Sequence, residues 1–308
     1  MILQMKDYGE GMTVGRMSVV RNSDRYFTIA VDEFEDNSIK GILFHESGSG
    51  GILFESLLEM FFNMDRLFDQ LGCPKQTVQR RQFSGIEDLS PEINKSSEKE
   101  RPGKLATFYV FVQYRYYASW QGNIKWIEGD AKIPFESELE LILAMYLLLT
   151  GNDRKEQVNN IMTTCHVAID TYHSGKFTGN YQNIPSETLE QQVEPVDLAK
   201  SLGTFMEYEL KNDDIPKYGL NYGQLISSDA CTLCRRGGKI ASFSIKVLFH
   251  EHATWQGIIY WREGRQQQLF RSYKEMLYLI ASVAEASAGN DGFRELLPVR
   301  AGLALSGT

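Results

Sequence analysis

The sequence predicts an α+β fold in which one small β-β-β-α unit occurs four times, with antiparallel sheets and one helix per unit. Three observations predict this fold. Two long segments match each other without a gap at a displacement of 135 positions. An earlier segment fits the same frame at a displacement of 81 positions. All three segments are rich in strand-forming residues and close on a pattern that starts a helix.

The strongest match joins residues 101–140 to residues 236–275. Both segments contain Ala-Ser/Thr-Trp-Gln-Gly, then a second Trp, then Glu-Gly, and both close on Phe-x-Ser-x-x-Glu. Residues 27–68 fit this frame, with Gly41 aligned to Gly122. A fourth copy is weaker: Asp170 aligns with Asp32, and each stands nine positions before a glycine, but the closing motif is missing.

The order of the four copies is A-B-A-B, which indicates that a two-unit module was duplicated in tandem. The first module is residues 1–150, with units at about 27–70 and 104–150. The second is residues 151–308, with units at about 165–210 and 239–286. A three-stranded sheet with one helix encloses only a small core and leaves edge strands unpaired. We therefore expect the units to pack within a module, and the modules to pair about a pseudo-twofold axis, as in a fused ancestral homodimer.

Within residues 104–150, two segments read as strands, 106–114 and 120–127, and a third strand ends near Phe135. A helix is predicted from Ser137, because Ser-x-x-Glu is a capping box. In that motif the serine oxygen accepts from the third helical amide and Glu140 reaches back to the amide of the serine. In the unit at 165–210 the best cap candidate is Asp197.

Composition restricts the classes of protein. The chain has 308 residues, a formal net charge of −8 and 43% hydrophobic residues, which is typical of a globular protein. The acidic balance makes duplex DNA an unlikely partner. No apolar run is long enough for a membrane span, and four cysteines do not make a disulfide scaffold, so we expect a cytoplasmic protein. Residues 84–103 are polar and read as a mobile linker.

Aromatic and amide side chains recur in the two B units and are candidate ligand-binding residues. All four tryptophans lie there: Trp120, Trp126, Trp255 and Trp261. They could stack on a flat ligand, or fill the gap between sheet and helix. Gln121 and Gln256 should point to the opposite face of their strands, where they could hydrogen-bond a ligand or another unit.

Three other side chains, Arg236, Cys231 and Cys234, are of types that bind anions or metals. Arg236, beside Arg235, could hold a phosphate, although an exposed charge at a linker is the commoner reading. Cys231 and Cys234 form a CxxC pair without a second pair nearby, so we expect reduced thiols and no metal. The glycine-rich residues 48–51 coincide with a hairpin turn, and the recurring Ser and Glu are explained by the capping box. We therefore expect no cofactor and no catalytic residue.

The repeated string Trp-Gln-Gly, Trp, Glu-Gly and Phe-x-Ser-x-x-Glu resembles an uncharacterised family of small-domain bacterial proteins. The resemblance covers the two B units well, the first A unit in part and the second A unit poorly. It implies a bacterial and cytoplasmic setting and brings no activity with it.

Four quasi-equivalent units without a recurring catalytic arrangement favour a non-catalytic binding protein. Such a scaffold would hold an unknown partner protein or a small, nucleotide-like ligand at the interfaces between units. One alternative is binding of single-stranded nucleic acid by the aromatic strands. Another is an enzyme with an unrecognised site, which would need a cleft with convergent titratable groups. The oligomeric state is left open by the sequence.

Overall fold

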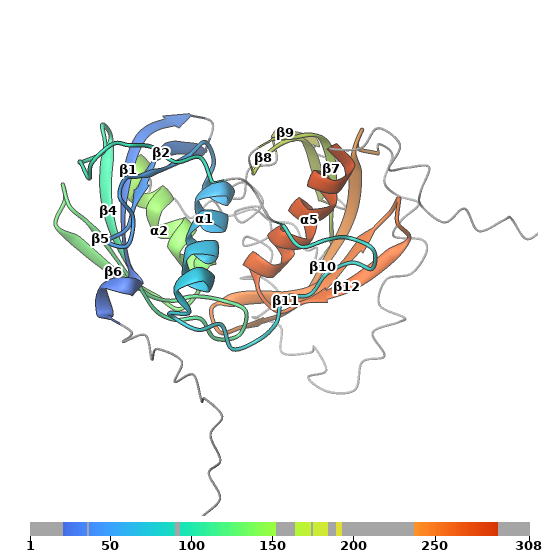
Figure 1. Cartoon of the computed structure of the whole chain (residues 1–308). Helices are drawn as coiled ribbons and strands as arrows, with labels where there is room; N and C mark the ends of the chain where they lie inside the picture. Colours follow the sequence, from blue (N-terminus) through green and yellow to red (C-terminus); the bar gives the residue numbers. More distant parts are fainter. Residues whose placement is uncertain are drawn as a thin grey trace, which may run out of the picture.

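The computed structural model describes residues 21–35, 37–89, 93–151, 164–173, 175–183, 189–192 and 237–288. In this part of the chain, the strands form two six-stranded antiparallel sheets, accompanied by three α-helices (Figure 1). The predicted α+β class with antiparallel sheets is confirmed.

The first sheet has the strand order β3-β2-β1-β4-β5-β6. Its strands are β1 (Tyr26–Glu35), β2 (Ser38–Phe44), β3 (Ile52–Phe54), β4 (Ala106–Tyr114), β5 (Gln121–Trp126) and β6 (Ala131–Phe135). A 3-10 helix, η1 (Asn22–Arg25), precedes β1. Helix α1 (Leu57–Leu71) follows β3, and α2 (Glu138–Thr150) follows β6. The predicted strand and helix positions in residues 104–150 are confirmed.

The second sheet has the order β12-β11-β10-β7-β8-β9. Its strands are β7 (Thr164–His173), β8 (Lys176–Asn183), β9 (Leu189–Gln192), β10 (Ala241–Glu251), β11 (Thr254–Trp261) and β12 (Gln266–Phe270), and α5 (Tyr273–Ala288) follows β12. The helix predicted after Asp197 lies outside the described residues. A helix is therefore observed after three of the four groups of three strands.

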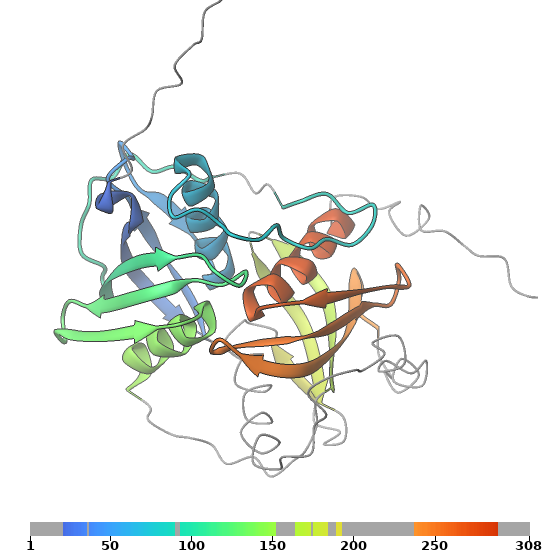
Figure 2. The same ribbon diagram turned by 90° about the horizontal axis from the view of Figure 1, so that it is seen from below.

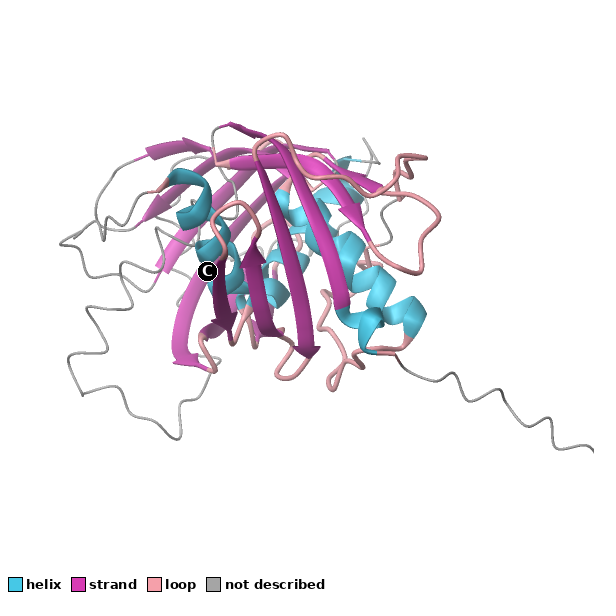
Figure 3. Cartoon of the chain, turned by 90° about the vertical axis from the view of Figure 1, so that its left-hand side faces the viewer, coloured by secondary structure: helices cyan, strands magenta, loops and turns pink. Residues whose placement is uncertain are grey.

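The helices lie between the two sheets, with α1 and α2 against the first sheet and α5 against the second (Figures 1 and 2). One hydrophobic core contains buried residues of both sheets and of all three helices. The two halves of the chain therefore share a core. The view from the side of the first sheet shows the other face of its strands, turned away from this core (Figure 3).

The four hairpins β1–β2, β4–β5, β7–β8 and β10–β11 contain the same irregularity. In each, the pairing skips one residue of the first strand, directly after Val31, Val112, Ile169 and Val247. The residue before each shift faces a glycine on the next strand. A Cβ on any of these glycines would lie 1.9–2.1 Å from a backbone oxygen of the first strand, so only glycine fits there. The glycines are Gly41, Gly122, Gly179 and Gly257.

Three helices begin with the predicted serine cap. In each the serine Oγ accepts from the third helical amide at 3.0–3.1 Å, at Ser56, Ser137 and Ser272. The predicted role of the glutamate was wrong in one detail. Each glutamate accepts from the amide of the residue before the serine, at 2.7 Å, instead of the serine amide. The extended serine brings that earlier amide over the first turn, so the carboxylate joins the helix to the preceding strand.

The prediction of a mobile linker at 84–103 was wrong for the part described. Its backbone pairs with the edge of the first sheet, since Leu53 N donates to Asn94 O at 2.8 Å. Arg101 then binds Asp32 through two bonds of 2.8 and 2.9 Å. Polar composition could not reveal this order, because backbone pairing and a bidentate ion pair need no apolar side chains.

Candidate functional site

The two halves of the chain meet through reciprocal hydrogen bonds at the helix caps. Ser137 Oγ, at the start of α2, donates to Ala253 O in the β10–β11 turn at 2.6 Å. Ser272 Oγ, at the start of α5, donates to Ala118 O in the β4–β5 turn at 2.8 Å. Both serines and both alanines are 135 positions apart. Each serine thus accepts a cap bond in its own half and donates its only proton to the other half.

The same two turns stack on each other. The rings of Tyr117 and His252, also 135 positions apart, are parallel within 3° with their centroids 3.8 Å apart. Both residues have positive φ, 57° and 53°, as the first position of a type I′ hairpin turn requires. His252 is therefore part of the contact between the halves.

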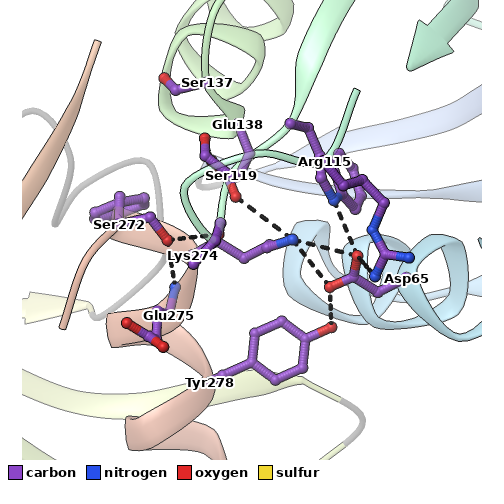
Figure 4. A network of polar contacts seen from close by, with 12 residues as sticks. Asp65, Arg115, Ser119, Ser137, Glu138, Ser272, Lys274, Glu275 and Tyr278 are labelled. Atoms are coloured by element: carbon purple, nitrogen blue, oxygen red, sulfur yellow. Dashed lines mark hydrogen bonds and ion pairs between the residues drawn. The ribbon is translucent and has the colours of Figure 1, made fainter. Parts of the chain in front are cut away.

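A buried group of charged side chains lies beside these turns (Figure 4). At its centre is Asp65 of α1, whose Oδ1 accepts from Arg115 Nη2 and from Trp120 Nε1, both at 2.9 Å. From the second half, Lys274 Nζ lies 3.1 Å from Oδ2, and the Tyr278 hydroxyl donates to Oδ2 at 2.8 Å. Asp65 and Arg115 are each 1% exposed. Two cations and two neutral donors from both halves therefore satisfy this carboxylate.

A second carboxylate completes the buried network. Glu138, in the first turn of α2, is fully buried and accepts from Ser119 Oγ. Its other oxygen lies 3.6 Å from Lys274 Nζ. The same ammonium lies 4.7 Å from the centre of the Trp120 ring. Lys274 therefore joins two carboxylates of the first half across the interface, over an aromatic face that also favours a cation.

Burial and charge act on these groups in different directions. Burial alone would raise the pKa of Asp65, but the charges of Lys274 and Arg115 outweigh it and hold the pKa well below its usual range. Burial raises the pKa of Glu138, and the nearby Lys274 only partly opposes this. Asp65 is thus the ionised carboxylate of the network, whereas ionisation of Glu138 costs more free energy than it does in water.

The network does not follow the sequence match at a displacement of 135 positions. Three residues of the network align, at the displacement of 135, with residues of different chemistry. Glu138 aligns with Tyr273, Lys274 aligns with Leu139, and Arg115 aligns with His250. Recurrence in the sequence therefore gives no sign of this network. A single sequence signal was available, which was a lysine at the apolar start of α5.

A cavity of about 360 Å³ lies next to the network, between α1, α5 and the segment 80–89. Its wall consists of Phe62, Arg66, Asp69, Gln70, Arg80, Leu89 and Tyr278. The Arg80 guanidinium lies 4.5 Å from the centre of the Tyr278 ring and 3.7 Å from Asp69. The cavity is thus bounded by both halves of the chain and combines aromatic, apolar and charged side chains.

The predicted tryptophans lie mostly in the core. Trp120, Trp255 and Trp261 are at most 2% exposed, and Trp126 is partly buried against the same core. Three of the four therefore have no face for a ligand to stack on. Large core side chains are expected where a small sheet packs on a single helix.

The two predicted glutamines form hydrogen bonds within their own hairpins. Gln121 Oε1 accepts from Tyr116 N at 3.1 Å, and Gln256 Oε1 accepts from Glu251 N at 2.9 Å. Each amide also donates, at 3.3 Å, to the backbone oxygen just before the helix cap. The recurrence of glutamine at this position thus has a local cause, which is closure of the turn.

Arg236, Cys231 and Cys234 lie outside the described residues. Within the described ranges, no three His, Cys, Asp or Glu side chains are grouped so that they could hold a metal ion. None of the helices in these ranges is both long enough and apolar enough to cross a membrane. Comparison of the chain with protein-family models, curated proteins and solved structures gives no match.

Proposed function

We propose that this protein is a non-catalytic binding protein that holds a small ligand between its two halves. The observation that carries the proposal is the contrast between the buried network and the cavity beside it. Asp65 and Lys274 bind each other and are at most 3% exposed, so a substrate could not reach them without separating the halves. The adjacent cavity is bounded by α1 and α5 and remains open to a ligand.

The cavity wall suggests the kind of ligand. Phe62 and Leu89 provide apolar contact area, while Arg66 and Arg80 favour an anionic group. Asp69 adds an acceptor on the same wall. A compact molecule that joins a flat ring to an anionic group, as in a nucleotide, fits this combination. The cavity volume of about 360 Å³ is near the lower end for small-molecule sites, which favours a small ligand.

Native mass spectrometry of protein purified gently from its source tests the proposal. A bound small molecule should appear as excess mass on the wild type. It should be lost from Leu89→Trp, which fills the cavity, and retained by Lys132→Gln, an exposed control on β6. If the wild type shows only the mass of the chain, and a protein partner is captured instead, the occupant of this interface is a protein and the small-ligand proposal fails.

We further propose that the fold arose from four units in A-B-A-B order, as two modules at 1–150 and 151–308. The four shared register shifts, each opposite a glycine, support a common origin of the hairpins. The reciprocal serine contacts support pairing of the modules about a pseudo-twofold axis, because in such an interface each contact occurs twice. We expect either module alone to be insoluble and the two to recover solubility when produced together. Two independently folded, monomeric halves would contradict this origin.

Binding of single-stranded nucleic acid is a second candidate, favoured by aromatic side chains outside the core. Tyr109 is 43% exposed on β4, and the exposed Tyr26 contacts Phe111 at 4.6 Å between ring centres. Lys125 pairs with Tyr109 across the sheet. Stacking on such a face would give binding that weakens with salt and is lost in Tyr109→Ala. Absence of binding to a labelled oligothymidine at low salt would remove this candidate.

The setting of the protein stays a prediction. A bacterial cytoplasmic origin comes from the resemblance described above and from the cysteine content. Fractionation of the source cells followed by immunodetection would test it directly.

A further inference from the structure

A second and larger cavity lies within the first half of the chain and shares Arg66 and Gln70 with the cavity at the interface. Its volume is about 760 Å³, which is in the range of sites for small organic ligands. Three segments enclose it: the turn between β2 and β3, one side of the last two turns of α1, and residues 93–96. It belongs to the unit at 27–70.

The aligned corners of the B units are filled by side chains. In those units a tryptophan ends the second strand and packs on the glycine of the following turn. A Cβ on Gly129 would lie 2.2 Å from the Trp126 ring, and a Cβ on Gly264 would lie at the same distance from the Trp261 ring. A glutamate of the same turn fixes the corner in each unit; Glu128 accepts from Thr107 N at 2.9 Å. An indole and a carboxylate thus occupy this corner in both B units.

The first unit has lost both groups. At a displacement of 81, His45 aligns with Trp126 and Ser47 aligns with Glu128. The imidazole is smaller than an indole, and it packs at 4.8 Å on the Phe27 ring. Its Nδ1 is held by Ser47, at 3.1 Å from the amide and 2.7 Å from Oγ. The corner that a tryptophan fills in the B units is therefore left open, and both His45 and Ser47 line the cavity.

The charge on the cavity wall has one sign. Arg66 and Lys95 line it, and no carboxylate occurs among the described residues that do so. This is unusual for a protein of net charge −8. Burial lowers the pKa of His45, so the imidazole is neutral near pH 7 and contributes a polar group without charge. Leu67 and Leu71 of α1 supply an apolar floor.

The wall is also preformed. Residues 94–96 run along β3, where Ser96 N donates to Gly51 O at 2.8 Å. They pass so close to the turn that a Cβ on Gly50 would lie 2.1 Å from Ser96 O. The glycine is therefore required for this wall to close on the turn. A ligand would meet the cavity already shaped, without first ordering a loop.

From these observations we propose that this cavity binds a small organic anion, with its phosphate or carboxylate group at Lys95 and Arg66 and its apolar body against Leu67 and Leu71. The site shares Arg66 and Gln70 with the cavity between the two halves, but its other wall residues differ, and it does not depend on the function proposed for that cavity.

A pair of dyes that differ in one charged group tests the proposal in the full-length protein. 8-Anilinonaphthalene-1-sulfonate carries a sulfonate on an apolar body, and N-phenyl-1-naphthylamine has the same body without the charge. We expect saturable binding of the sulfonate to the native protein at one site, and at least about tenfold weaker binding of the neutral dye. Fluorescence titration gives the affinities and calorimetry gives the stoichiometry.

Two variants and a control assign the site. Lys95→Gln should weaken sulfonate binding about tenfold and leave the neutral dye unaffected. His45→Trp restores the side chain of the B units and should abolish binding of both dyes while the melting temperature is kept. Lys132→Gln removes an exposed lysine on β6, outside the cavity, and should change neither affinity. Arg66 lines both cavities and is left unchanged.

The outcomes are decisive in either direction. Absence of saturable sulfonate binding to the wild type would overturn the proposal, as would binding that Lys95→Gln and Lys132→Gln change equally. Binding that persists in a folded His45→Trp protein would place the dye elsewhere. If His45→Trp does not fold, Lys95→Gln and its control decide alone. Leu89→Trp, which fills the other cavity, should leave sulfonate binding intact, so failure of one site does not imply failure of the other.

Discussion

Replacing Asp65 by asparagine should destabilise the protein strongly, although it changes only one atom of a buried side chain. The carboxylate neutralises Lys274 and Arg115 at 3.1 and 2.9 Å, and all three side chains are at most 4% exposed. An amide of the same size cannot supply that charge, so Lys274 and Arg115 keep only the more distant Glu138 and the exposed Asp69 as anionic partners. Breaking a buried ion pair by removing one partner costs about 3–5 kcal/mol, and we expect a loss in that range.

Urea unfolding at pH 7 measures the loss from the midpoint, provided that the slope is unchanged. Asp69→Asn is the matched control, because Asp69 binds the same Arg115 at 2.7 Å but is 42% exposed. Its loss should stay below about 1 kcal/mol, as for other exposed ion pairs. Equal, small losses for the two variants would refute the reasoning, because the network would then add no more stability than a surface contact.

Three further predictions concern the caps, the acid of α2 and the hairpins. Ser137→Ala should lower the free energy of unfolding by about 1–2 kcal/mol in urea, because the cap bond is lost and Ala253 O is left without its partner from the other half. Glu138→Gln should flatten the pH dependence of stability. Burial raises the pKa of Glu138 in the folded protein, so its ionisation destabilises the fold as pH rises past the ordinary value of 4.5. Melting temperatures from about pH 4 to about pH 8 measure this dependence. If the variant and the wild type show the same slope of melting temperature against pH, the reasoning is wrong. Gly122→Ala should cost more than about 2 kcal/mol, since its Cβ would lie 1.9 Å from Phe111 O, and a melting temperature equal to that of the wild type would contradict the steric argument.

The contrast between the two kinds of contact at the interface is informative. Among the described residues, the serine contacts occur twice, whereas the network around Asp65 occurs once. Reciprocal contacts are expected when two similar modules pair, and they fix the arrangement of the halves. A buried charged network that appears on one side specifies one pairing over others, because any other arrangement would bury unpaired charges. Ion pairs of this kind thus favour a single register between similar halves.

The sequence by itself determined the local elements of this protein. The strand at 106–114 and the serine caps were predicted from pattern and recurrence. The four glycines recur in the sequence alignment, although their place opposite a register shift was not predicted. They depend on neighbours along the chain or on the next strand, so the residue types needed at each position are few. A bulge that admits only glycine, or a helix start that needs a hydroxyl, leaves a signature in the sequence wherever it recurs.

Tertiary structure alone decided the rest. Lys274 and Asp65 are 209 positions apart, and no periodicity connects them. The burial of the tryptophans, the pairing of residues 94–96 with the edge of the first sheet and the cavity at His45 likewise depend on which surfaces meet. The physical reason is that burial and charge pairing are set by all the groups that surround a side chain in space. A local pattern shows which face of an element is apolar, but it does not show what covers that face.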